Sequence, residues 1–117
     1  MMFKSQRMPR LMALVTAFGI AGPSMAFAQG DAAKGQALYT AQKCQVCHSI
    51  AGAGNKANPL DGVGGKLSAG DIRQWIVNPK EMATKTNSTA KPPMSANYAK
   101  LPAADIDALV AYMQSLK

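Results

Sequence analysis

Both cysteines and the only histidine of this chain lie within five consecutive residues, inside the stretch KCQVCHS from Lys43 to Ser49. Thiol and imidazole groups are the side chains that most often bind metals or form covalent attachments. Any fold of this chain must therefore present Cys44, Cys47 and His48 together from one short piece of backbone.

Three common uses of cysteine fit this cluster poorly. A disulfide between Cys44 and Cys47 would close a ring of only four residues, which gives little loop-entropy stabilisation. A thioredoxin-like redox pair is expected beside a βαβ pattern, and this sequence has no alternation of strand and helix patterns. A structural zinc site needs four protein ligands, whereas the cluster offers three.

The pattern C-x-x-C-H is instead typical of covalent haem attachment. The two thiols add across the haem vinyl groups as thioethers, and the adjacent histidine becomes the proximal iron ligand. Two intervening residues let the backbone turn once, so that both sulfurs reach one edge of the porphyrin. The sequence therefore predicts one covalent haem c per chain, with Cys44 and Cys47 as tethers and His48 as an axial ligand.

The N-terminal residues have the pattern of an export signal. A basic start precedes an apolar run over residues 11–20, and Ala26-Phe27-Ala28 fits a small-x-small cleavage site. The run is shorter than the roughly 20 residues that cross a bilayer, which disfavours an uncleaved anchor. We expect a Sec-type signal peptide over residues 1–28, a single domain over residues 29–117 and a periplasmic location.

The expected mature chain is mildly basic. The sequence has 13 Lys and Arg against 6 Asp and Glu, and three basic residues leave with the signal, which gives a net charge of +4. No Arg-rich stripe with interleaved aromatic residues occurs, so nucleic-acid binding is not expected. Lysines in and beside the loops near the cluster are better suited to attracting an acidic protein partner; they are Lys43, Lys56, Lys85 and Lys91.

Three segments carry helix patterns. Residues 30–44 have Asp31 as a good N-cap, and residues 67–79 combine a capping box at Ser68 and Asp71 with a stop at Pro79. Residues 101–117 place apolar side chains at i, i+3, i+4 and i+7. The long stretches between them are predicted to be loops, and loops of this length are unusual unless they carry function or wrap a bound group.

The haem motif, the glycine in the first helix and the amphipathic last helix together resemble the small monohaem class I cytochromes c, over essentially all of residues 30–117. The resemblance implies an all-α fold in which the N- and C-terminal helices cross, with a third helix and long loops wrapped around one haem. It also implies that Gly35 allows the close crossing and that Tyr39, one turn later, packs there.

A methionine is the expected second axial ligand, because the chain has no second histidine. Met113 belongs to the apolar stripe of the last helix, and Met82 follows the third helix in a charged turn. Met94 follows two prolines that hold the chain extended, and the family places a proline-flanked methionine shortly before its last helix. We therefore predict Met94; if it is only a loop residue, the iron is open to other ligands.

The resemblance implies three further residues of the haem pocket. The carbonyl of Pro59 would accept a hydrogen bond from the second ring nitrogen of His48, and Leu60 would pack on the haem face. Trp75 would pack against haem or donate to a propionate. The alternatives are that Pro59 is a simple turn residue and that Trp75 has the more usual role of a core residue.

These expectations describe a one-electron carrier and not an enzyme, because both axial positions are filled and no spare acid, base or open site is evident. Two alternatives stay open. A haem-based ligand sensor or small peroxidase requires an open distal position on the iron. A module dedicated to one larger dehydrogenase or oxidase complex has the same sequence features as a free carrier.

Overall fold

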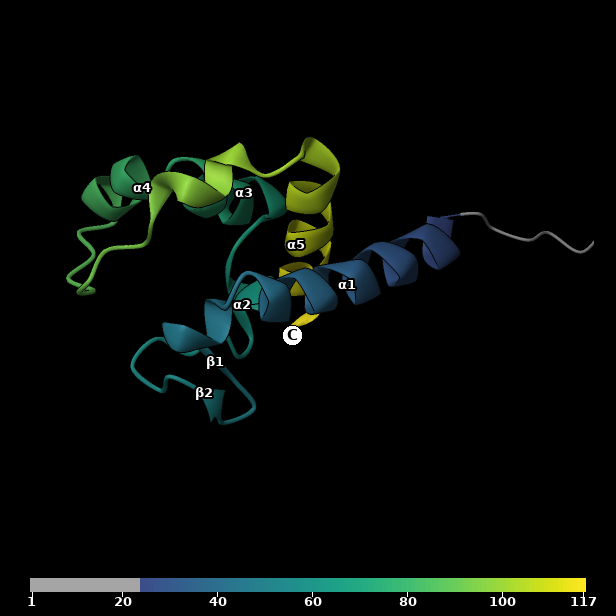
Figure 1. Ribbon diagram of the computed structural model, residues 1–117, viewed down its shortest axis with the longest axis horizontal. Helices are drawn as coiled ribbons and strands as arrows, with labels where there is room; N and C mark the ends of the chain where they lie inside the picture. The colour runs from purple at the N-terminus through teal and green to yellow at the C-terminus, as the bar shows by residue number, and fades with distance from the viewer. Residues whose placement is uncertain (1–23) are drawn as a thin grey trace, which may run out of the picture.

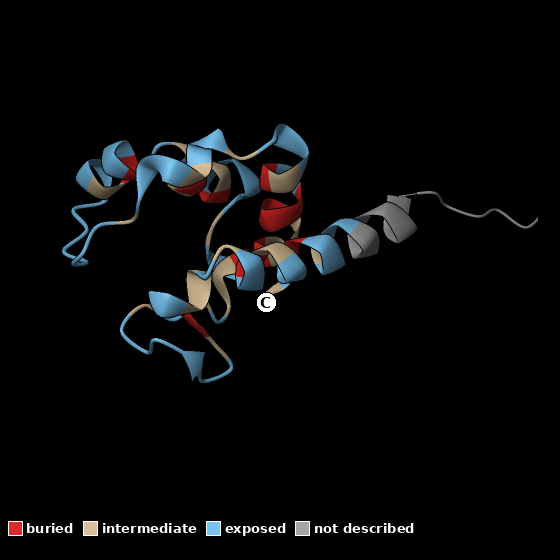
Figure 2. Cartoon of the chain, in the orientation of Figure 1, coloured by how far each residue is buried: buried red, intermediate tan, exposed pale blue. Residues whose placement is uncertain are grey.

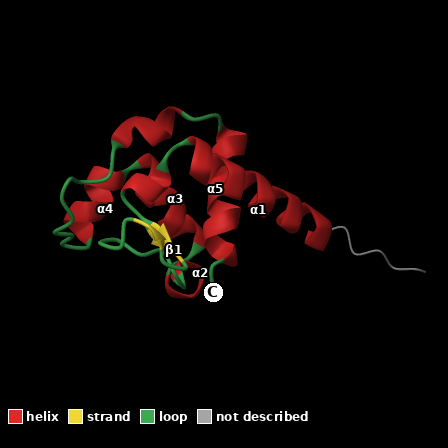
Figure 3. Cartoon of the chain, turned by 60° about the horizontal axis from the view of Figure 1, so that its bottom comes forward, coloured by secondary structure: helices red, strands yellow, loops and turns green. Residues whose placement is uncertain are grey.

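Helices make up most of the chain that the structure describes. The computed structural model describes residues 24–117 and contains five α-helices in that range (Figure 1). They are α1 (Ser24–Ala41), α2 (Val63–Lys66), α3 (Ala69–Val77), α4 (Pro79–Lys85) and α5 (Ala103–Ser115), with 3-10 helices η1 (Cys44–Val46) and η2 (Ala96–Lys100). The prediction of an all-α fold is confirmed, with one two-stranded sheet as a minor addition (Figure 3).

Helix α1 begins earlier than the sequence pattern predicts. Residues 1–23, most of the predicted export signal, lie outside the described residues. In the uncleaved chain α1 starts at Ser24, so Asp31 lies inside the helix, and its prediction as the N-cap is wrong. The reason is that Met25, Ala26 and Ala28 are good helix formers, and they continue the backbone ladder upstream of Asp31.

The crossing of α1 and α5 organises the domain (Figure 1). A Cβ added at Gly35 would lie 2.6 Å from the Cβ of Tyr112 and would overlap the carbonyl oxygen of Ala108. Only glycine therefore permits this separation of the two helix backbones. Tyr39, one turn after Gly35, is 7 % exposed and packs at the crossing, so both predictions for these residues are confirmed.

One apolar cluster connects α1, α3 and α5 (Figure 2). Helix α5 contributes most of it, and the expected apolar positions of that helix are buried; the cluster comprises Tyr39, Ile72, Ile76, Ile106, Leu109, Val110 and Met113. Among the described residues no large side chain is completely buried. The core made by these side chains is thus small, as expected for a domain of this size.

Helix α3 forms the Ser68 half of the predicted capping box. The side-chain oxygen of Ser68 accepts a hydrogen bond from the backbone N–H of Asp71 at 3.1 Å, and the helix ends at Val77, two residues before Pro79. Pro79 does not lead into a loop, however, because it occupies the first turn of α4. A proline lacks only the N–H that a helix start leaves unpaired, so it both ends α3 and begins α4.

The predicted loops contain more regular structure than the sequence indicates. Besides α4, they include α2, η2 and the antiparallel strands β1 (Ser49–Ile50) and β2 (Ala53–Gly54), which pair Ser49 with Gly54. Each element is too short to show a repeating apolar period. None of the helices in the described residues is long and apolar enough to span a membrane.

Candidate haem-attachment site

The C-x-x-C-H motif forms a single tight turn immediately after α1. Lys43 adopts the left-handed conformation, with φ of 58°, and is the N-cap residue of η1. The carbonyl of Cys44 then accepts hydrogen bonds from the N–H groups of Cys47 at 3.1 Å and His48 at 2.9 Å. The predicted single turn of backbone between the two cysteines is therefore present.

The two thiols occupy different environments. Cys44 is partly buried and packs against the apolar cluster, whereas Cys47 is exposed; both are free thiols. Burial raises the pKa of the Cys44 thiol above its ordinary value, although a backbone hydrogen bond opposes this shift. Cys44 consequently links the motif to the core, and Cys47 lies at its outer edge.

The imidazole of His48 is held by one ring nitrogen. Its Nδ1 atom lies 3.0 Å from the carbonyl oxygen of Asn58, and since a carbonyl oxygen only accepts, Nδ1 must carry the proton. Nε2 then keeps the lone pair that a metal requires. The prediction that the carbonyl of Pro59 plays this part is corrected by one residue, to Asn58.

Two asparagines of the following loop hold the outer carbonyl groups of the turn. The backbone N–H of Asn55 donates to the carbonyls of Gln45 and His48, both at 3.0 Å. Its side-chain Nδ2 donates to the carbonyl of Val46 at 3.1 Å, and Nδ2 of Asn58 donates to the carbonyl of Cys47 at 3.3 Å. We call Asn55 and Asn58 the asparagine clip.

Gly54 brings this loop close enough for the clip to form. Its φ is +106°, and an added Cβ would lie 3.0 Å from the carbonyl oxygen of Gln45 and would overlap that of His48. Both the conformation and the spacing exclude a side chain at this position. The β1–β2 turn is thereby pressed against the motif.

Pro59 and Leu60 follow the clip and differ in burial. Pro59 is exposed and forms an isolated parallel bridge with Ser49, while Leu60 is partly buried and packs against the apolar cluster. The backbone N–H of Leu60 donates to the carbonyl of Ser49 at 2.8 Å. These contacts fix where residue 58 presents its carbonyl to His48. Trp75 lies on α3, distant in sequence, and is partly buried.

The three methionines outside the predicted signal have distinct surroundings. Met113 is buried in the α5 face of the cluster, and Met82 is buried on α4, at 6 % exposure. Met94 is partly buried, packs against the cluster from the segment before η2, and lines a surface pocket of about 670 Å³ beside α4. Of the three, Met94 thus combines partial exposure with a position outside an α-helix.

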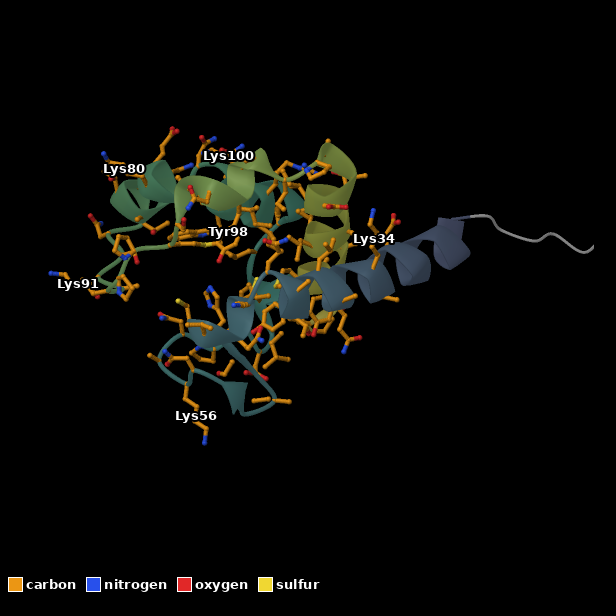
Figure 4. All side chains as sticks on the ribbon, in the orientation of Figure 1. Lys34, Lys56, Lys80, Lys91, Tyr98 and Lys100 are labelled. Carbon is orange, nitrogen blue, oxygen red and sulfur yellow. The ribbon has the colours of Figure 1, made fainter. Side chains whose placement is uncertain are left out.

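Tyr98 on η2 packs against the apolar cluster that Cys44 of the motif also contacts, although it was not among the site residues predicted from the sequence. Its pKa is raised, first by burial and then by the charges of Cys44 and Cys47. An aromatic residue one turn beyond the predicted ligand was the signal in the sequence; Figure 4 labels its position.

These surroundings suit a haem group. Apolar side chains from separate segments pack against the cluster while remaining only partly buried, among them Ile50, Leu60, Leu67, Met94, Tyr98 and Leu101. Two free thiols and an imidazole with its Nε2 lone pair available supply the attachment chemistry of haem c. The donor set and the incompletely covered apolar side chains therefore fit the predicted cofactor.

The charged residues are unevenly paired. The two ion pairs of the described residues join Lys34 to Asp105 at 3.1 Å and Arg73 to Asp107, and both acids lie on α5. Lys43, Lys56, Lys85 and Lys91 form no ion pair with the described residues. Lys56, Lys80 and Lys91 extend outward on the side away from the start of α1 (Figure 4).

One of three comparisons with known proteins found a match, and that match agrees with this site. A search of curated proteins and a search of solved structures each found no match. The family model described as Cytochrome c matches residues 32–117, which include the turn, the asparagine clip, Met94 and all of α5. Members of this family bind haem covalently and use it in electron transfer. This chain therefore belongs to the cytochrome c family.

Proposed function

We propose that this protein is a periplasmic one-electron carrier with a single haem c ligated by His48 and Met94. The observation that carries the proposal is the Nδ1 hydrogen bond of His48, which leaves Nε2 available beside two free thiols. Haem c, when bound, supplies an iron that alternates between the ferrous and ferric states.

Different residues of the chain have different roles in binding the cofactor. Cys44 and Cys47 would form the thioethers, and His48 would supply a nitrogen ligand to the iron. The hydrogen bond to Asn58 keeps the proton on Nδ1 and raises the basicity of the ring. Leu60, which packs against the apolar cluster, and the partly buried Trp75 would contribute apolar cover, and the bridge of Pro59 to Ser49 fixes the loop that carries the acceptor carbonyl.

Met94 is the methionine whose surroundings suit the distal position. A methionine sulfur opposite histidine raises the reduction potential of haem iron. The two prolines before Met94 restrict its segment, which lowers the entropy cost of presenting the sulfur. Cys44, Met94 and Tyr98 pack against the same apolar cluster, which supports a path of the chain that returns from Met94 to the motif.

The unpaired lysines favour a partner with an acidic docking patch. Lys43 adjoins the motif in the sequence and Lys56 lies between the two clip residues, so both add positive charge to the segments that form the attachment turn. Complementary charge increases the encounter rate of redox proteins more than it increases their affinity. We infer that the carrier docks transiently, and that export by the predicted signal delivers it to the compartment of its partners.

A redox titration of the haem-loaded protein, followed by optical spectra, tests this function. We expect one reversible one-electron transition and a low-spin spectrum in both oxidation states. The reduced protein should not bind carbon monoxide at neutral pH, because both axial positions are occupied. Ready binding of carbon monoxide would contradict the carrier and favour the ligand sensor or small peroxidase.

A further inference from the structure

The turn that carries the haem motif has little internal hydrogen bonding of its own. Within the motif, only the carbonyl of Cys44 accepts from the motif's own N–H groups, those of Cys47 and His48. The carbonyls of the next four residues, from Gln45 to His48, all accept from Asn55 or Asn58. The shape of the turn therefore depends on contacts from outside it.

Asn58 makes contact with both of the last two motif residues. Its carbonyl oxygen accepts from Nδ1 of His48 at 3.0 Å, and its side-chain Nδ2 donates to the carbonyl of Cys47 at 3.3 Å. The side-chain hydrogen bond fixes the position of residue 58 relative to the segment 47–48. The backbone carbonyl of the same residue holds the imidazole of that segment. The length of the His48 hydrogen bond is thereby tied to an amide side chain.

Asn55 fixes the other end of the loop. Its Oδ1 accepts from the N–H of Ala57 at 3.0 Å, while its Nδ2 donates to the carbonyl of Val46 at 3.1 Å. The Asn55 side chain thus has two roles. Its Oδ1 stabilises the loop that leads to Asn58, and its Nδ2 holds that loop against the turn. Its amide donor and its amide acceptor are both used.

We infer that Asn55 and Asn58 are positioning residues for the proximal side of the haem, acting through the carbonyls of Val46 and Cys47 to set the Nδ1 hydrogen bond of His48. The inference rests on the proposed function, because it concerns the ligand that His48 provides. A well-formed Nδ1–H bond to a carbonyl increases the basicity of the imidazole and favours ferric iron. Loosening the clip should therefore raise the reduction potential.

The experiment compares Asn55→Ala and Asn58→Ala with the native haem-loaded protein. Each variant removes one side chain and retains the other, as well as the backbone carbonyl of residue 58. Asn97→Ala is the matched control, since Asn97 is exposed and its side chain forms no hydrogen bond with the described residues. The measurements are the reduction potential and, by NMR, the solvent-exchange rate of the His48 Nδ1 proton.

We expect both clip variants to shift the reduction potential upward and to accelerate Nδ1 proton exchange roughly five-fold, the size of effect that one net hydrogen bond produces. Asn97→Ala should leave both quantities at the native values. A general loss of stability would not move the potential and the His48 proton together while the distal spectrum is retained. Native potential and native exchange in both clip variants would overturn the inference.

The two levels of the proposal fail in different ways. A native chain that carries no covalent haem after export and maturation would overturn the proposed carrier itself. Normal haem content with an unaltered His48 proton in the clip variants would overturn only the positioning role. The Asn97→Ala control separates either result from a nonspecific effect of removing an asparagine side chain.

Discussion

Tyr39 and Tyr112 pack edge to face where α1 crosses α5, with ring centroids 5.8 Å apart and ring planes at 68°. Aromatic pairs in this geometry contribute about 0.5–1.5 kcal/mol beyond their buried area. The hydroxyl of Tyr39 has no hydrogen-bond partner among the described residues, and burial raises its pKa to about 12. The ring of Tyr39 therefore stabilises the crossing, while its hydroxyl opposes it.

Removing this hydroxyl should stabilise the protein. Tyr39→Phe keeps the ring pair and deletes a buried polar group without a partner, so we expect the free energy of unfolding at pH 7 to rise by about 1 kcal/mol. Denaturant unfolding of the haem-loaded protein measures the change. Tyr112→Phe is the matched control in the same ring pair; a loss of stability in Tyr39→Phe that exceeds the control would contradict the expectation.

The same residue predicts a difference at alkaline pH. The unfolded chain loses the Tyr39 proton near pH 10.0, whereas the folded protein keeps it until about pH 12. Because the folded state holds more protons in this window, this contribution to stability is complete below pH 10 and is lost as pH rises toward 12. Unfolding curves at several pH values should show a smaller alkaline decline in Tyr39→Phe than in Tyr112→Phe.

Adding one methyl group at the helix crossing should be costly. Gly35→Ala forces a Cβ against Ala108 and Tyr112, and overpacking of this kind typically costs about 1–3 kcal/mol. Gly65→Ala in α2 provides the control, because a Cβ there meets no atom within 4 Å. Denaturant unfolding should separate the two variants; equal stability would mean that α1 and α5 can move apart without penalty.

Met94→Leu should remove the distal ligand with little change in side-chain volume. Methionine sulfur bound to ferric haem gives a weak charge-transfer band in the far red, and we expect this variant to lose the band and to bind carbon monoxide when reduced. Met82→Leu is the control, since Met82 is buried on α4. A band that persists in Met94→Leu and disappears in Met82→Leu would reassign the ligand.

The unpaired lysines predict salt-sensitive electron transfer. With hexacyanoferrate as an anionic redox probe, the rate constant should fall as ionic strength rises from about 0.01 M to about 0.15 M, because the screening length shortens from roughly 30 Å to roughly 8 Å. Lys56→Gln should slow the reaction more than Lys34→Gln does, because the ammonium group of native Lys34 is already paired with Asp105. A rate constant, measured by stopped flow, that does not change with ionic strength would argue against electrostatic attraction by the lysines.

Residues whose side chains determine the local structure were predictable from the sequence. Ser68 caps α3 through its own oxygen, and Gly35 marks the crossing because the absence of a side chain is visible in the sequence. The turn of the haem motif follows from the spacing of Cys44 and Cys47. In each case, the chemistry of the side chain itself carries the information.

Backbone contacts explain most of what the sequence did not reveal. Every residue has a carbonyl, so nothing in the pattern distinguishes Asn58 from Pro59 as the acceptor for His48; the fold of the loop decides. Helix α4 was missed because Pro79 signals both the end of one helix and the start of another, and its seven residues bury only Met82 besides that proline. The asparagine clip was missed for the same reason, because it binds main-chain carbonyls and lies outside any apolar pattern in the sequence.

Because the clip holds the main-chain carbonyl of Val46, the exposed side chain of that residue is not needed to maintain the turn. Val46 is 64 % exposed, although its carbonyl is bound by Asn55. A substitution at residue 46 therefore alters the surface offered to a docking protein without altering the backbone that carries His48. In the proposed carrier, the surface offered to a partner can thus vary separately from cofactor attachment, although the residues concerned are neighbours.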